Sequence, residues 1–216
     1  MRLSAYRARG IAKEYNQAMN YTVKDIQRLR ETTGAGPLDC KKALEEAASF
    51  DEAVKTLEKK GKQRAEKIAG QERETRQGYI AAYTHFAGNL GAIVELNCTT
   101  DFVSRNEDFR TLGNELALQV AAMNPQYISF EDIPAEVVEK ARQEVLNDPE
   151  VQERPTHIQA QIVEGKVRKD LEPLALLTQT WFKDEKVKIS DLLSDLIRKT
   201  GENIVVRRFA RFKLGE

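Results

Sequence analysis

Residues 79–98 read YIAAYTHFAGNLGAIVELNC, and the spacing of their apolar side chains decides the fold class. A period of two runs through the second half of this stretch, which is typical of a strand with one buried face. The break at 87–89 predicts a hairpin loop, which joins a first strand over 79–86 to the strand that ends at Cys98. The apolar positions of the second strand are Leu90, Ala92, Val94, Leu96 and Cys98.

A long helix is predicted directly after this hairpin. Ser104, followed three residues later by Glu107, is a capping-box pattern and indicates that the helix is capped at Ser104. Pro125 marks the position by which that helix must end. The face predicted to be buried consists of Phe109, Leu112, Leu116, Val120 and Met123.

The rest of the chain predicts further helices and one last strand. Helices are expected after Pro134 and after Pro155, and a short helix over 190–199 is closed by Gly201. A final strand is expected over 204–214. Strands early, helices between and a strand late describe an α+β fold, in which a small three-stranded antiparallel sheet packs against helices.

An N-terminal module of three short helices is predicted over 21–61. Capping-box patterns at Thr22 and Ser49 open the first and third helices, and Gly61 is expected to end the third. The turn GAGP at 34–37 reverses the chain between the first two helices. The module holds few large apolar side chains, so its core is marginal and a partner would help to hold it.

The remaining segments are polar and charged. Residues 1–20 form a basic N-terminal extension, for which a targeting remnant and a misassigned start codon are both open explanations. Residues 62–78 are expected to form a charged linker, and the core domain is expected to span 79–216. The basic strip at 59–76 could bind RNA, but a solvated tether is the simpler interpretation.

The composition argues against several classes of protein. The chain has 216 residues, with 34 Lys and Arg against 34 Asp and Glu, so its net charge is zero. Stable nucleic-acid binding is therefore not expected, because dedicated nucleic-acid binders are usually basic. No apolar run approaches the ~20 residues of a transmembrane helix, so no membrane contact is expected. Cys40 and Cys98 are interpreted as buried free thiols in a reducing cytosol, with an organelle stroma or matrix as the alternative location.

Motifs for catalysis are missing from the sequence. Gly61-Lys62 is followed by Gln63, so it does not complete a phosphate-binding loop. His85 and His157 have no Cys or carboxylate cluster beside them at metal-ligand spacing. We therefore expect that the chain is not an enzyme and holds neither a cofactor nor a metal.

One stretch, CTTDFVSRNEDF at 98–109, is left to carry the function. Phe102 lies in the short turn between the strand that ends at Cys98 and the helix capped by Ser104. Phe109 has the helical spacing of a core anchor, which leaves Phe102 free to point outward from a stiff turn. Exposed aromatic side chains on rigid scaffolds make interaction hot spots, so this turn is predicted to bind a partner.

Two stretches of the chain resemble the elongation factor Ts family. They are TGAGPLDCKKAL at 33–44 and NCTTDFV at 97–103, and the resemblance extends from about Tyr21 to the end of the chain. It implies a ubiquitin-associated-like three-helix module, a linker and a core of the short, single-core form, which lacks a last helix found in some members. It also implies a guanine nucleotide exchange factor that binds elongation factor Tu, GDP-bound and nucleotide-free, and promotes GDP release.

The same resemblance implies which residues touch the GTPase. An Asp-Phe pair and its neighbours would enter the GTPase near its nucleotide and dislocate Mg²⁺, the sheet would contact it further away, and the three-helix module would grip its G domain. These residues are Thr100, Asp101, Phe102 and Val103 at the turn, Leu90 and Gly91 on the sheet, and Pro37, Leu38 and Lys41 on the module.

The chain departs from the family pattern at several positions. Many members have two bulky apolar residues, typically methionines, where this chain has Pro37 and Leu38. Gln119 stands where some members place a histidine, and the basic residues 1–20 have no counterpart in the family.

Two other classes and a homodimer stay open at this point. An RNA-binding or ribosome-associated protein would use the strip at 59–76 together with Arg207, Arg208 and Arg211. A ubiquitin-binding adaptor is indicated only by the three-helix module, which is evidence from fold analogy alone.

Overall fold

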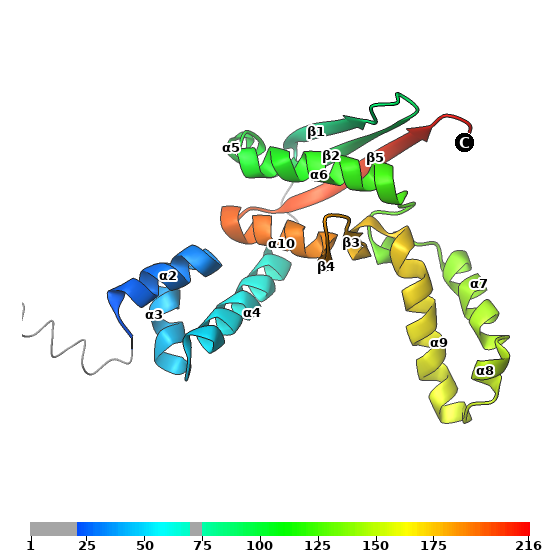
Figure 1. The fold of residues 1–216 in the computed structure, drawn as a ribbon, viewed down its shortest axis with the longest axis horizontal. Helices are drawn as coiled ribbons and strands as arrows, with labels where there is room; N and C mark the ends of the chain where they lie inside the picture. Colours follow the sequence, from blue (N-terminus) through cyan, green and yellow to red (C-terminus); the bar gives the residue numbers. More distant parts are fainter. Residues whose placement is uncertain (1–20, 70–74) are drawn as a thin grey trace, which may run out of the picture. The chain divides into compact units, whose positions relative to one another are not determined.

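The computed structural model describes residues 21–69 and 75–216 and shows a mixed helix and sheet fold (Figure 1). The chain divides into two compact units, one up to Gly70 and the other from Gln71 onward. The basic extension predicted at 1–20 and residues 70–74 of the predicted linker lie outside the described residues.

The first unit consists of helices α2 (Val23–Thr33), α3 (Pro37–Glu46) and α4 (Phe50–Ala69). The capping box at Thr22 is confirmed, since its side chain accepts from the Asp25 amide and the Asp25 side chain accepts in return. Gly34 ends α2 in the left-handed region at φ 65°, which a residue with a side chain rarely adopts. The three helices enclose a small core of Tyr21, Leu29, Cys40, Ala43, Leu44, Ala53 and Leu57.

The prediction that Gly61 ends the third helix is wrong. Helix α4 continues through Gly61 to Ala69, and Ala65 within the extension is buried. A glycine inside a helix costs only about 1 kcal/mol relative to alanine, and the Lys, Gln, Arg, Ala and Glu residues around it favour helix. Much of the sequence expected to be linker is therefore helical.

The second unit is built on a sheet of three antiparallel strands in the order β1-β2-β5. The strands are β1 (Gln77–Thr84), β2 (Leu90–Cys98) and β5 (Ile204–Lys213). The alternation predicted for β2 is confirmed, because Ala92, Val94, Leu96 and Cys98 are buried and Leu90 is half-buried. Cys98 at the end of β2 lies opposite Gln77 of β1 and Ile204 of β5.

Helix α6 (Glu107–Met123) runs across the sheet and supplies most of its cover (Figure 1). Phe109, Leu116 and Val120 are buried as predicted, and the helix ends at Met123 before Pro125. Met123 itself is 47% exposed, contrary to the prediction, because it is the last residue of the helix. Helix α10 (Ile189–Thr200) ends at Gly201, as predicted.

A helical hairpin lies between α6 and α10 in the sequence. It consists of α7 (Ala135–Leu146), the single turn α8 (Pro149–Gln152) and α9 (Thr156–Leu171), with short 3₁₀ turns at Phe130–Asp132, Glu172–Leu174 and Leu176–Thr178. Figure 1 shows α7 and α9 side by side, and this confirms the helices predicted after Pro134 and Pro155. The hairpin has an apolar cluster of its own, formed by Ile133, Val145, Val151, Val163, Val167, Leu171 and Ala175.

A short hairpin of β3 (Thr180–Trp181) and β4 (Asp184–Lys188) was not predicted. Gln119 of α6, which is fully buried, attaches it to the core. The Gln119 amide donates to the carbonyl of Thr180 at 3.0 Å and to Gln179 Oε1 at 3.0 Å, and its oxygen accepts from the Phe182 amide at 3.0 Å. Gln119 is thus a structural residue, because a buried amide needs these partners.

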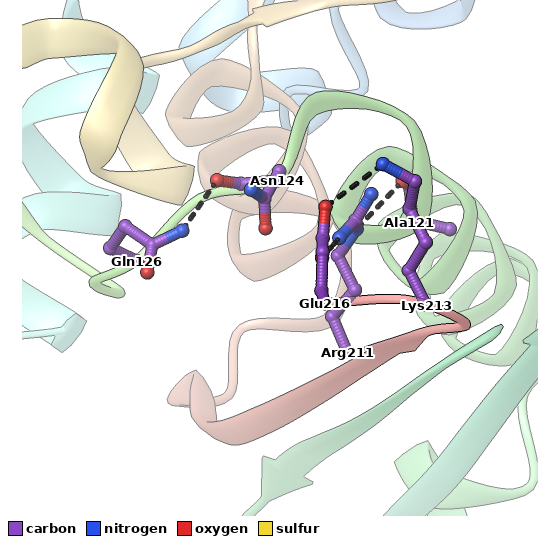
Figure 2. A network of polar contacts seen from close by, with 6 residues as sticks. All are labelled: Ala121, Asn124, Gln126, Arg211, Lys213 and Glu216. Atoms are coloured by element: carbon purple, nitrogen blue, oxygen red, sulfur yellow. Dashed lines mark hydrogen bonds and ion pairs between the residues drawn. The ribbon is translucent and has the colours of Figure 1, made fainter. Parts of the chain in front are cut away.

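The end of β5 is tied to the end of α6 (Figure 2). Arg211 Nε donates to the carbonyl of Ala121 at 3.1 Å, and its guanidinium pairs with Glu216 at 2.7 Å. Ala121 lies in the last turn of α6, where carbonyls lack a partner within the helix. Lys213 also pairs with Glu216 at 2.9 Å. None of the described helices is long and apolar enough to cross a membrane.

Two glycine substitutions test this packing in opposite directions. A Cβ at Gly78 would lie 2.4 Å from the backbone oxygen of Leu96, whereas a Cβ at Gly165 in α9 meets nothing within 4 Å. We expect Gly78→Ala to destabilise the sheet unit by about 1–3 kcal/mol, because the neighbouring strand must shift. Gly165→Ala should stabilise by up to about 1 kcal/mol. Urea unfolding followed by circular dichroism measures both, and equal effects of the two variants would contradict the register.

Candidate functional site

The predicted Asp-Phe turn is a single helical turn, α5 (Asp101–Ser104), between the end of β2 and the start of α6. Thr100 is its N-cap, with an extended backbone at φ -121° and ψ 156° and a side-chain oxygen that accepts from the Val103 amide at 3.4 Å. Figure 1 shows α5 at one end of α6, beside the sheet. We call residues 100–104 the α5 corner.

Two residues of the α5 corner face inward and anchor it. Val103 is buried, so its side chain packs in the core and holds α5 in place, whereas its neighbours Asp101 and Phe102 are exposed. Ser104 is also buried, and its hydroxyl donates to the carbonyl of Asp101 at 2.8 Å.

The predicted N-cap at Ser104 is therefore wrong. Helix α6 is capped by Asn106, whose side-chain oxygen accepts from the Asp108 amide at 2.8 Å. The Ser104-Glu107 pattern gave a wrong prediction because Ser104 is the last residue of α5, and an N-cap residue requires a non-helical backbone.

Phe102 points away from the protein, with 79% of its surface exposed, while Phe109 is fully buried. This is the division between the two phenylalanines that their spacing predicts. Asp101 is also exposed, and its carboxylate pairs with Arg105 at 3.1 Å. An exposed aromatic ring beside an exposed carboxylate, both on an anchored turn, offers a compact surface for a protein partner.

Glu202 contacts the α5 corner from a distant part of the chain. Its carboxylate accepts from the Thr100 amide at 3.0 Å and from the Thr100 hydroxyl at 2.6 Å, although the two residues are 102 positions apart. Sequence reasoning missed this contact, because nothing local marks Glu202 as the partner of Thr100. The antiparallel pairing of β2 with β5 was the only signal that could have found it.

The thiol of Cys98 lies beneath the corner. It is fully buried and donates to the carbonyl of Thr100 at 3.1 Å. Burial, and to a smaller extent the nearby Glu202 charge, raises the pKa of Cys98 to about 11. The thiol is therefore protonated at neutral pH and acts as a structural side chain and not as a nucleophile.

The other predicted contact residues lie on two further surfaces. On α3, Pro37 is exposed, Leu38 is 75% exposed, and half-buried Lys41 lies 3.8 Å from Glu45. Leu90 and Gly91 begin β2, at the end of the strand away from Thr100, and line a surface pocket of about 600 Å³ with Phe212 and Leu214 of the C-terminal segment. Within residues 21–69 and 75–216, no group of three His, Cys, Asp or Glu side chains is placed to hold a metal.

The two phenylalanines give a matched test of this geometry. Phe109→Ala should destabilise the sheet unit by about 3–5 kcal/mol, because it removes a fully buried ring. Phe102→Ala should change the free energy of unfolding by no more than about 0.5 kcal/mol, as is usual for an exposed position. Thermal and urea unfolding of both variants measure this difference, and a large loss from Phe102→Ala would show that its ring is part of the core.

Comparison with known proteins identifies the family of this chain. The sequence matches the family described as "Elongation factor TS" over residues 11–216. That match begins before residue 21, so the expectation that residues 1–20 have no family counterpart is wrong for 11–20. The chain is 49% identical over 92% of its length to an elongation factor Ts of Thermotoga petrophila, of which 98% is covered. It is 48% identical over 92% of its length to that of Thermotoga neapolitana, covering 99%. The chain therefore belongs to the elongation factor Ts family, whose members act in protein synthesis.

Proposed function

We propose that this chain is a guanine nucleotide exchange factor for elongation factor Tu, which binds the GTPase and speeds the release of GDP. The observation that carries the proposal is the ring of Phe102, exposed on an anchored turn in a member of the elongation factor Ts family. The reaction breaks no covalent bond, so the chain is not an enzyme in the usual sense and needs no catalytic side chain.

Exchange depends on a difference between two affinities. The chain must bind the nucleotide-free GTPase more tightly than the GDP-bound form, and by linkage it then weakens GDP binding by the same factor. Moving a population from 1:99 to 99:1 requires a difference of about 5.5 kcal/mol. Burying one phenylalanine ring supplies roughly 2–3 kcal/mol, so Phe102 requires help from other surfaces.

The exposed residues at the α5 corner have distinct roles in this proposal. Phe102 inserts between packed helices of the G domain and separates them. Asp101 disturbs the groups that hold Mg²⁺ and its water ligands. The Asp101–Arg105 ion pair is exposed on both sides and contributes about 0–1 kcal/mol at most, so it leaves the Asp101 carboxylate free to change partners.

The other two surfaces supply affinity. The exposed side chain of Leu38, with Pro37 and Lys41 on the same helix, docks the three-helix module on the G domain. Leu90 and Gly91 contact the GTPase from the opposite end of β2. Three separate contacts give a broad interface, so weakening any one of them does not abolish binding.

The RNA-binding alternative is weakened by what its arginines already contact. Arg208 pairs with Glu95 at 2.6 Å, and Arg211 pairs with Glu216 at 2.7 Å and donates to a backbone carbonyl. The Arg208 pair also lowers the pKa of the Glu95 carboxyl. Arg211, whose side chain is largely buried, would have to give up these partners before it could bind phosphate, whereas the Arg208 side chain is exposed and its ion pair contributes little.

Removing the ring of Phe102 tests its proposed insertion between helices of the G domain. We expect Phe102→Ala to slow factor-stimulated GDP release about 30- to 150-fold, which corresponds to the roughly 2–3 kcal/mol of ring burial. Stopped-flow fluorescence of labelled GDP on elongation factor Tu measures the rate. Leu146→Ala, at a partly exposed apolar position of α7 outside the three surfaces, is the control and should leave the rate unchanged. An unchanged rate in Phe102→Ala would remove the ring from the mechanism.

Removing the side chain of Leu38 tests the docking surface. We expect Leu38→Ala to raise the factor concentration at half-maximal release by about 5- to 10-fold, because it removes roughly 1 kcal/mol or more of apolar burial, with little change in the maximal rate. The rate of GDP release as a function of factor concentration separates the two quantities. Val23→Ala, also exposed and apolar but on α2, is the matched control. A fall in the maximal rate with no change in half-saturation would contradict a docking role.

A further inference from the structure

We propose that Glu202 is the positioning residue of the α5 corner, whose carboxylate holds Thr100 so that α5 presents Phe102 in one fixed orientation. This inference rests on the proposed exchange function and adds a residue that touches no partner. It follows from the contacts between two segments that lie 102 positions apart in the sequence.

Helix α5 is too short to fix its own orientation. It consists of four residues, and helices shorter than about 12–15 residues are marginal in isolation. Its backbone bonds are long, at 3.3 Å from the Ser104 amide to the Thr100 carbonyl and 3.3 Å from the Arg105 amide to the Asp101 carbonyl. Contacts from outside α5 must therefore keep the orientation of the turn fixed when Phe102 binds a partner.

Glu202 supplies such a contact in a form that orders the whole turn. One carboxylate oxygen accepts from the Thr100 amide at 3.0 Å and the other from the Thr100 hydroxyl at 2.6 Å. The hydroxyl has only one proton, so donating it to Glu202 turns the oxygen lone pairs toward the Val103 amide, 3.4 Å away. Charge-assisted bonds are about twice as strong as neutral ones and polarise the bonds that follow them.

Glu202 is itself fixed by its surroundings. Gly201, in the left-handed region at φ 72°, ends α10 directly before it, and the Glu202 amide donates to the Thr200 hydroxyl at 3.4 Å. Two residues later Ile204 is buried and pairs with Cys98 of β2. The position of the Glu202 carboxylate is therefore set by the start of β5. Through this carboxylate, Thr100 is tied to the same sheet as β2, the strand that ends just before it.

The consequence is that the turn that carries Phe102 is already ordered before it binds a partner. A side chain that must be ordered on docking loses binding free energy, and a displacement of about 1 Å at a site can lower a rate by about 100-fold. Glu202→Ala should therefore slow GDP release by about 10- to 100-fold although it removes no atom of the Phe102 side chain.

The experiment compares Glu202→Ala with Thr100→Val, which keeps the shape of threonine and removes the hydroxyl. Glu202→Gln keeps one acceptor for the hydroxyl but turns an N–H₂ toward the Thr100 amide, so it should be intermediate. Glu185→Ala, at an exposed carboxylate of β4, is the control for loss of a negative charge. The full chain is used throughout, and GDP release from elongation factor Tu is followed by stopped-flow fluorescence.

A double-mutant cycle separates positioning from general stability. If Glu202 acts through Phe102, Glu202→Ala slows release in the unaltered chain and has no further effect in Phe102→Ala, while it lowers the melting temperature equally in both. Such non-additivity is expected of residues that form one unit. Full additivity of the two effects on release would overturn the proposal.

Amide exchange in the free chain tests the contact without the GTPase. Glu202→Ala should raise the exchange rates of the Thr100 and Val103 amides by about 10-fold or more, with the amides of β1 unchanged. Unchanged exchange at Thr100 and Val103 would overturn the positioning role even if the chain is an exchange factor. Faster exchange in a chain that fails to release GDP would instead overturn the proposed function and leave the contact intact.

Discussion

The antiparallel pairing of β2 with β5 is the constraint on which the rest of the structure depends. It places Cys98 opposite Ile204, and so brings the turn after β2 against the turn before β5. Glu202 reaches Thr100 only because of this register. The same pairing carries the buried face of β2, against which α6 packs. One strand pair therefore fixes both the core and the α5 corner, and a shift of one residue would expose the apolar side chains of β2 and separate Glu202 from Thr100.

The surface of the corner follows from what its interior requires. Val103 and Ser104 are buried, and the Ser104 hydroxyl donates to the carbonyl of Asp101. Asp101 and Phe102 on the same short turn must therefore face outward. An exposed phenylalanine gains nothing for the free protein, because its ring stays in water. It gains free energy only when a partner covers it. A turn held in advance by the contact between Thr100 and Glu202 also loses little backbone conformational entropy on binding. The proposed exchange mechanism then also needs the docking surfaces proposed on α3 and at the start of β2, since one ring cannot supply the required difference in affinity.

Much of the fold could be predicted because it depends on patterns among residues that are close in the sequence. Alternation in β2, the caps at Thr22 and Gly201, and the prolines before α7 and α9 each depend on neighbouring residues. The errors at Gly61 and Ser104 came from reading a weak local signal without its context. The β3–β4 hairpin and the Glu202 contact depend on partners 60 or more residues away, through Gln119 and Thr100, and no local pattern reports these. The exposure of Phe102 was predictable because Phe109 already filled the core position. Its role in binding, and those of Leu38 and Leu90, remain predictions.

The most direct measurement is the affinity of this chain for elongation factor Tu in its nucleotide-free and GDP-bound forms, by titration calorimetry. We predict that the nucleotide-free form binds about 10⁴-fold more tightly, and that Phe102→Ala reduces this ratio more than it reduces affinity for the GDP-bound form. Equal affinity for the two forms would contradict the account, because a protein that binds both equally cannot displace GDP however tightly it binds.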